Sequence, residues 1–376
     1  MKLEAVELRR IEISLVAPFE TSFGVQQQRD ILLVKALTDL GEGWGECVAG
    51  EDPSYSPEYV DGAQEVLRRF LLPPLLNRSD VAAEKVAEIL RPVHGHYMAK
   101  AAIEMALLDA ELRARGESLA HYFGAVRDLV DSGVSVGIHN SIDALLRTVD
   151  SYLGEGYRRI KLKIKPGWDL EPVRAVRHRF RDVPLQVDAN TAYRLVDAQH
   201  LARLDEFDLL LIEQPLPEDQ ILDHARLAKT VHTPICLDES ITSAQVAGDA
   251  IEMGACRVIN VKPGRVGGYL EARKIHDLCA ERGVPVWMGG MLETGIGRAG
   301  NVAMAAMPNF SLPGDTSASS RYYKRDVTEP FVLEGGRLRV PDGPGLGVTV
   351  DEEYLDSITT AVQRVSAAES SRASRS

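Results

Sequence analysis

The chain has 376 residues, 45% of them hydrophobic and 26% charged, which is the balance of a soluble globular protein of more than one domain. The formal net charge of −12 argues against nucleic acids and anionic membranes as partners. The sequence has no run of 18 apolar residues, no secretory leader and no CxxC pair among its four cysteines, so we expect a cytoplasmic protein with reduced thiols.

Residues 1–125 predict a small α+β domain. Alternating apolar and polar residues predict strands at 6–16 and 30–37. Three glycines are expected in or near the turn after the second strand: Gly41, Gly43 and Gly45. Helical spacing of apolar residues predicts helices over 57–92 and 97–115. Strands followed by helices are typical of an α+β domain.

Beyond residue 125 the pattern changes to strands that alternate with helices. Apolar runs that start about 25 residues apart predict parallel strands at 134–138, 159–164, 185–189, 209–214, 235–239, 258–261, 286–289 and 310–312. Eight such strands predict an α/β fold, a TIM-type barrel over 126–318. A doubly wound sheet is the alternative, although the glycine-rich loop that typically follows its first strand is absent. Residues 319–376 are expected to pack back on the first domain, with a frayed tail from about 367.

Three acidic residues end successive predicted strands. Asp188, Glu213 and Asp238 are each 25 residues apart, one strand–helix repeat, so the barrel brings them to the same height. Three neighbouring carboxylates repel one another unless a cation joins them. Their hard oxygens suit Mg²⁺ or Mn²⁺ better than zinc. The alternative for each acid is a surface carboxylate or a helix N-cap, but their common phase favours a metal site.

Lysines follow the same strand ends. Lys161, Lys163 and Lys165 alternate along the second strand and so point the same way, into the barrel mouth. Lys262 ends the sixth strand, across the barrel. Neighbouring ammonium groups lower each other's pKa, which brings a lysine toward the range of a general base. A substrate held on the metal would have a lysine on each face, although solvated lysines at strand ends are the alternative.

This set of groups suits proton removal from a carbon next to a carboxylate. The product is an enediolate dianion, which a divalent cation stabilises through the carboxylate oxygens. One lysine removes the proton, and the other returns it from the opposite face or stabilises the anion.

The strand-end motifs resemble those of the enolase superfamily, muconate-lactonising subgroup: Lys-Leu-Lys at 161–163, Asp-Ala-Asn at 188–190, Glu-Gln-Pro at 213–215, Asp-Glu-Ser at 238–240 and Lys-Pro-Gly at 262–264. Longer stretches at 160–169, 260–268 and 289–295 are similar to those of o-succinylbenzoate synthases and N-acylamino acid racemases. The resemblance runs over nearly the whole chain. It implies a modified (β/α)7β barrel whose first domain is a capping domain.

The resemblance also implies roles for individual residues. Asp188, Glu213 and Asp238 become Mg²⁺ ligands, Lys163 and Lys262 the acid/base pair, and Lys161 a residue that tunes Lys163. Substrate contacts are expected from the barrel and from cap loops at 19–24 and 51–57, through Ser135, Lys165, Asn190, Gly290, Met291, Leu292, Phe19, Phe23 and Tyr55. Ordinary core packing is the alternative for the three aromatic residues, and Glu239 and Asp315 are left as supporting or ion-pair residues.

The implied activity is Mg²⁺-dependent racemisation of N-acyl (N-succinyl) amino acids by 1,1-proton transfer through a metal-stabilised enediolate, with Mn²⁺ or Co²⁺ as substitutes. The same site suits o-succinylbenzoate synthase, a syn dehydration in menaquinone biosynthesis. Dipeptide epimerase and muconate cycloisomerase are the alternatives within the superfamily, and a non-catalytic binding protein is the remote one. The expected partners are a small-molecule carboxylate substrate and further copies of the chain, from a dimer to an octamer.

Overall fold

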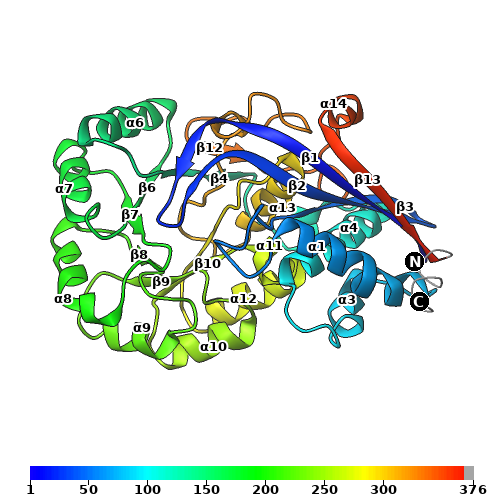
Figure 1. Ribbon diagram of the computed structural model, residues 1–376, viewed down its shortest axis with the longest axis horizontal. Coiled ribbons are helices and arrows are strands. Elements are labelled where there is room, and N and C mark those ends of the chain that lie inside the picture. The colour runs from blue at the N-terminus through cyan, green and yellow to red at the C-terminus, as the bar shows by residue number, and fades with distance from the viewer. Residues whose placement is uncertain (368–376) are drawn as a thin grey trace.

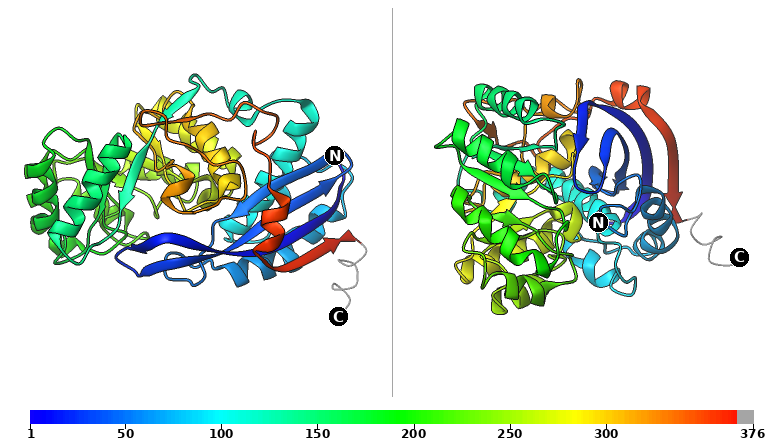
Figure 2. Two further views of the ribbon diagram at one scale, coloured as in Figure 1. Left: turned by 90° about the horizontal axis from the view of Figure 1, so that it is seen from above. Right: turned by 60° about the vertical axis from the view of Figure 1, so that its left-hand side comes forward.

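A four-stranded antiparallel sheet and a seven-stranded parallel sheet organise the chain in the computed structural model, which describes residues 1–367 (Figure 1). The two sheets lie side by side, each with its own helices (Figure 2). The tail predicted from about residue 367 lies, apart from Ala367, outside the described residues. No helix among the described residues is long and apolar enough to cross a membrane.

The antiparallel sheet has the strand order β13-β1-β2-β3. Its strands are β1 (Leu3–Glu20), β2 (Val25–Thr38), β3 (Gly41–Cys47) and β13 (Thr359–Ser366). Strand β13 comes from the end of the chain and pairs with β1, with Arg9 opposite Val362. The β1–β2 hairpin is long enough to reach the parallel sheet, where the Ile138 N–H donates to the Glu20 carbonyl at 2.9 Å.

Helix α4 (Tyr97–Arg115) covers this sheet, as its apolar spacing predicts. Gly43 and Gly45, expected in or near the turn after the second strand, lie just beyond that turn, inside β3. A Cβ on Gly45 would come within 2.0 Å of the Ala102 carbonyl oxygen of α4. The glycines therefore let a strand and a helix approach each other closely.

The helix predicted over 57–92 is two helical segments, a continuous one over 60–76 and a shorter one over 83–89. Its elements are α1 (Val60–Val66), the π-helical turn η1 (Leu67–Leu71), α2 (Leu72–Leu76) and α3 (Ala83–Ile89). Pro73 and Pro74 donate no backbone N–H, which interrupts the α-helical hydrogen bonds next to the π-helical turn.

The parallel sheet has the order β11-β10-β9-β8-β7-β6-β5, so neighbours in the chain are neighbours in space. Its strands are β5 (Gly133–Val136), β6 (Arg159–Lys163), β7 (Leu185–Asp188), β8 (Ile212–Glu213), β9 (Ile235–Leu237), β10 (Val258–Val261) and β11 (Val286–Met288). The helices around it are α6 (Ile142–Glu155), α7 (Leu170–Arg179), α8 (Ala198–Leu201) with the 3-10 helices η2 (Leu195–Asp197) and η3 (Ala202–Phe207), α9 (Ile221–Leu227), α10 (Ala244–Glu252), α11 (Pro263–Val266), α12 (Tyr269–Glu281) and α13 (Gly295–Ala305). The predicted barrel of α/β type is thereby confirmed.

The eighth predicted strand, over 310–312, is not a regular strand. Phe310 forms a single parallel bridge with Val286, and Gly314 forms one with Ser132 just before β5. Pro313 has no N–H to donate to a strand ladder, so pairing cannot continue through it. The segment nevertheless lies between the two edges of the sheet and closes the barrel, as a (β/α)7β fold requires.

Short elements connect the two parts. They are α5 (Leu119–Tyr122), β4 (Leu129–Asp131), η4 (Ser319–Arg321), β12 (Arg337–Arg339) and α14 (Glu352–Ser357). Strand β12 pairs with β4, so the last part of the chain returns to the barrel before it reaches the antiparallel sheet.

Candidate active site

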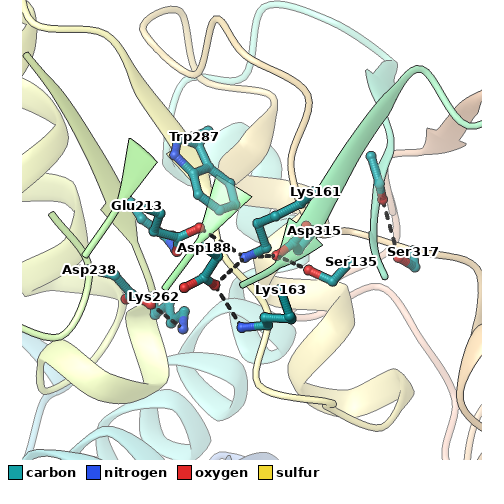
Figure 3. A network of polar contacts seen from close by, with 12 residues as sticks. Ser135, Lys161, Lys163, Asp188, Glu213, Asp238, Lys262, Trp287, Asp315 and Ser317 are labelled. Carbon is teal, nitrogen blue, oxygen red and sulfur yellow. Dashed lines mark hydrogen bonds and ion pairs between the residues drawn. The ribbon is translucent and has the colours of Figure 1, made fainter. Parts of the chain in front are cut away.

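Six charged side chains gather at the carboxyl ends of the parallel strands (Figure 3). They are Lys161, Lys163, Asp188, Glu213, Asp238 and Lys262, each at most 8% exposed. Strand register aligns them, since Lys163 pairs with Asp188 and Asp188 with Glu213 on neighbouring strands. Groups of this charge are rarely buried unless they pair with one another or have a function.

Lys161 lies at the centre of the cluster. Its Nζ contacts Asp315 Oδ2 at 2.7 Å, Glu213 Oε2 at 3.0 Å and Asp188 Oδ2 at 3.2 Å. It also lies 4.8 Å from the ring centroid of Trp287. Burial lowers the pKa of Lys161, but the three carboxylates together outweigh it and hold the pKa well above its usual value. The expected lowering by neighbouring ammonium groups is therefore wrong for this lysine, because carboxylates surround it.

Lys163 donates from Nζ to Asp188 Oδ2 and to Asn190 Oδ1, both at 2.6 Å. Asn190 has a left-handed backbone, with φ of 41°, and its amide donates to Glu239 Oε1 at 2.8 Å. Burial, together with repulsion from Asp238 and Asp188, raises the pKa of Glu239 to about 7. Asn190, which follows β7, thus connects Lys163 to Glu239, which follows β9.

Lys262 lies on the other side of the three acids, with β7, β8 and β9 between its strand and that of Lys163. Its Nζ donates to Asp238 Oδ2 at 2.7 Å and to the Tyr55 hydroxyl at 3.1 Å. Burial lowers the pKa of Lys262, but Asp238 and other anionic neighbours raise it more, to well above its usual value. Arg265 contacts the second oxygen of Asp238 at 2.9 Å.

The three acids differ in how well they are neutralised. Burial raises the pKa of Asp188, but Lys163 and Lys161 bring it below its usual value. Lys262 and Arg265 act in the same way on the pKa of Asp238. Burial and repulsion from Asp188 raise the pKa of Glu213 well above its usual value.

These residues suit a divalent metal ion by donor chemistry. Three buried carboxylates at successive strand ends supply hard oxygens, and a cation among them would remove the repulsion that raises the pKa of Glu213. As placed, however, no group of three or more His, Cys, Asp or Glu side chains within residues 1–367 is arranged to hold a metal ion. Lysine ammonium groups take the oxygens instead.

The other barrel residues expected to contact substrate are dispersed around the cluster. Ser135 is buried on β5 and donates to Asp315 Oδ2 at 3.2 Å. Lys165 is half-exposed at the rim and pairs with Glu20 of the hairpin at 3.2 Å. A Cβ on Gly290 would come within 2.9 Å of the Asp315 carbonyl oxygen, so only glycine fits there without a shift.

The two residues after Gly290 form a constrained loop. The Met291 N–H donates to Glu293 Oε2 at 2.9 Å, and Leu292 has a φ of 58° and is buried. A non-glycine residue in the left-handed region indicates a backbone that its surroundings fix.

The three aromatic residues of the cap loops differ in position. Tyr55 contacts Lys262 through its hydroxyl, and its ring lies 5.7 Å from that of Phe23. Phe23 is 37% exposed, whereas Phe19 is buried in the core, 5.5 Å from the guanidinium of Arg321. Of the three, only Tyr55 touches the charged cluster.

Four further residues complete the cluster and were not singled out from the sequence as site residues. Arg159 pairs with Asp315 at 2.8 Å, and Asn260 donates to Glu213 Oε1 at 2.6 Å. Strand alternation could have found both, because Arg159 is in phase with Lys161 and Asn260 with Lys262. No sequence signal points to Arg265 or to the contact between Trp287 and Lys161.

Comparison with known proteins agrees with this geometry. Residues 144–354 match the family described as Enolase C-terminal domain-like, and residues 5–124 match the Mandelate racemase / muconate lactonizing enzyme, N-terminal domain. The chain is 64% identical over 362 residues to an N-succinylamino acid racemase of an Amycolatopsis species, covering 96% of this chain and 98% of that one. It is 48% identical over 361 residues to an o-succinylbenzoate synthase of Geobacillus kaustophilus, covering 96% of each.

A solved structure of an enolase superfamily member from Listeria innocua superposes with a TM-score of 0.94 at 40% identity, covering 98% of this chain and 100% of the other. The family match over more than half of the chain and these identities confirm the resemblance that the strand-end motifs carry. The chain therefore belongs to the enolase superfamily, in the family that contains N-succinylamino acid racemases and o-succinylbenzoate synthases.

Proposed function

We propose that the chain racemises N-acylamino acids, in particular N-succinylamino acids, by moving the α-proton between Lys163 and Lys262. One observation carries this proposal. Two buried lysines flank the same three carboxylates from strands β6 and β10, with three strands between them. A planar carbanion held between the two Nζ atoms could receive a proton on either face, which inverts or restores the α-carbon. The relatives named as N-succinylamino acid racemases support the substrate class.

We propose Mg²⁺ as the metal, with Mn²⁺ or Co²⁺ as substitutes, on Asp188, Glu213 and Asp238. Bound there, it would hold the substrate carboxylate and stabilise the charge that develops when the α-proton leaves. Lys163 and Lys262 contact the same carboxylate oxygens and would give them up to a bound metal ion. Asn190 and Tyr55 then remain as polar partners that can orient the two ammonium groups.

Proton transfer needs one neutral and one protonated lysine at the start of each turnover. Because racemisation runs in both directions, Lys163 and Lys262 are each placed to donate or to accept the proton through Nζ. Lys161 stays ion-paired with Asp315 and Glu213, so it fixes the carboxylates rather than exchanging protons with substrate.

A second activity, o-succinylbenzoate synthase, is favoured by the relatives of that name. In this syn dehydration we assign proton removal to Lys163, whose protonated Nζ can return that proton to the departing hydroxyl on the same face so that water leaves, while Lys262 stabilises the anion. Both reactions begin with the same step, loss of a proton next to a carboxylate.

The two runner-up activities receive less support. A dipeptide epimerase would need acidic residues on the eighth barrel segment to hold the substrate amine. Asp315 is the acid at that point, and it is paired with Arg159 and Lys161 instead. Muconate cycloisomerase uses the same kind of cluster, so a comparison of turnover on several substrates is needed to distinguish it from a racemase.

Incubation of one N-succinylamino acid enantiomer with the protein and Mg²⁺ in D₂O tests the racemase proposal. We expect both enantiomers to form, with deuterium at the α-carbon. The same conditions with N-acetylamino acids, a dipeptide, muconate and the synthase substrate rank the activities. Absence of α-exchange with every N-acylamino acid would overturn the assignment.

Removal of the metal provides a separate test. Treatment with EDTA should abolish turnover, and added Mg²⁺, Mn²⁺ or Co²⁺ should restore it. Turnover that persists at full rate in excess chelator would contradict the metal assignment while leaving the lysine pair open to test.

A further inference from the structure

A surface cavity of about 520 Å³, widely open to solvent, lies outside the charged cluster, between α6, the β1 strand and η4. Helix α6 contributes one polar face, on which Arg147, Ser151 and Glu155 follow one another at intervals of four residues, about one helical turn each. Val16 and Arg321 form the opposite wall. None of the six charged side chains at the strand ends lines it, so the cavity is separate from that cluster.

Arg321 is buried at this cavity without a counter-ion. Its side chain is enclosed by the rings of Tyr152, Tyr322 and Phe19, at 5.0, 4.9 and 5.5 Å, and the residue is 9% exposed. Nη2 donates to the Ser135 carbonyl at 2.9 Å, whereas Nε is buried and has no acceptor. Within residues 1–367, Arg321 forms no ion pair. A buried charge without a counter-ion is costly, so this arrangement favours an anion.

Arg147 supplies a second cation to the same cavity. It is exposed on α6 and, among the described residues, forms neither an ion pair nor a side-chain hydrogen bond. Glu155 is the one carboxylate among the lining residues, and it accepts a hydrogen bond from Ser151 at 3.4 Å. The lining therefore has two guanidinium groups and one carboxylate, a net positive charge in a protein whose formal net charge is −12.

We propose that this cavity binds a small oxyanion, a carboxylate or a phosphate, between Arg321 and Arg147. Guanidinium groups bind such oxygens with charge-assisted, often bidentate hydrogen bonds. The cavity volume is within the range of small-molecule sites. The ring of Tyr152 gives an apolar wall for the carbon part of an organic acid.

Isothermal titration calorimetry of the full chain, with inorganic phosphate and with succinate in separate titrations, tests the proposal. At least one anion should bind saturably. Arg147→Met should weaken that binding about tenfold or more, the size expected for one charge-assisted hydrogen bond. Arg321→Met should abolish it. Arg203→Met is the matched control, because Arg203 is also exposed and forms no ion pair among residues 1–367.

The pattern of results identifies the anion and can overturn the site. Binding of phosphate alone assigns a phosphate site, and binding of succinate alone a carboxylate site. Succinate binding that is unchanged in Arg147→Met would belong to the charged cluster and would overturn the proposal, as would the absence of saturable binding for both anions. If Arg321→Met does not fold, Arg147→Met, on the exposed face of α6, still shows whether the anion binds in this cavity. The readout is binding heat, so failure of the racemase proposal does not affect it.

Discussion

The two lysines proposed to carry the proton differ in their partners, although both are buried at strand ends. Lys163 is held by Asp188 and by the Asn190 amide, both parts of the barrel. Lys262 is held by Asp238 and by Tyr55, which comes from the cap. The cap therefore contacts Lys262 directly, whereas it reaches Lys163 through Asn190, whose carbonyl accepts a hydrogen bond from Ser22 at 3.1 Å.

Substitution of either lysine tests whether both take part in proton transfer. Lys163→Ala and Lys262→Ala should each reduce racemisation by about 10²- to 10⁴-fold, because each removes one acid/base group. In the synthase reaction, Lys163→Ala should be the more damaging of the two. Steady-state rates on both substrates measure this, with Lys274→Ala as a control because that lysine is 62% exposed on α12. Full racemase activity in either site variant would contradict two-base transfer.

At the scale of elements, the contact between β3 and α4 holds the cap together. Helix α4 is buried over most of its length and lies against Gly43 and Gly45 of β3. Trp44, between them, donates its backbone N–H to Asp109 of α4 at 2.9 Å. The strand can approach the helix only because two side chains are missing.

Gly45→Ala should destabilise the protein by about 1–3 kcal/mol, since its methyl group would meet the Ala102 carbonyl oxygen. Gly24→Ala is the control, because nothing lies within 4 Å of a Cβ at Gly24. Urea denaturation of both variants measures the difference. Equal unfolding midpoints would show that the strand can move away from the helix at little cost.

At the scale of the whole molecule, two cap carboxylates join the cap to the barrel. Glu104 accepts hydrogen bonds from the backbone N–H groups of Tyr269 and Leu270, at the start of α12. Glu46 accepts from Thr294 and Gly297 at the start of α13. A carboxylate at a helix N-terminus is favourable, but burial raises the pKa of Glu104 to about 8 and that of Glu46 to about 7.

The raised pKa values predict a pH dependence of stability. The ordinary pKa of Glu104 is 4.5, so between pH 4.5 and about 8 the folded protein holds a proton that the unfolded chain has released. The contribution of Glu104 to the free energy of unfolding is therefore complete below pH 4.5 and is lost as the pH rises through about 8. Glu104→Gln should therefore show a smaller decline in its urea midpoint over this range than the unsubstituted protein. Glu88→Gln, at an exposed position of α3, should follow the unsubstituted protein; a parallel decline in Glu104→Gln would refute the argument.

Much of the charged cluster follows from the sequence because repeats and alternation are local properties. Parallel strands that recur about every 25 residues put Asp188, Glu213 and Asp238 at one height, and the period of two puts Lys161 and Lys163 on one face. The same alternation would have included Arg159 and Asn260. Helix α4 likewise follows from its own apolar spacing.

The sequence by itself thus determined the barrel, its strand-end acids and lysines, and the family. Only the tertiary structure decided which cation meets which carboxylate, that Tyr55 reaches Lys262 from the cap, and that Gly43 and Gly45 are strand residues. It also decided that Arg147 and Arg321 share a cavity. The physical reason is that these contacts join segments far apart in the chain, and no local periodicity specifies a distance between such segments.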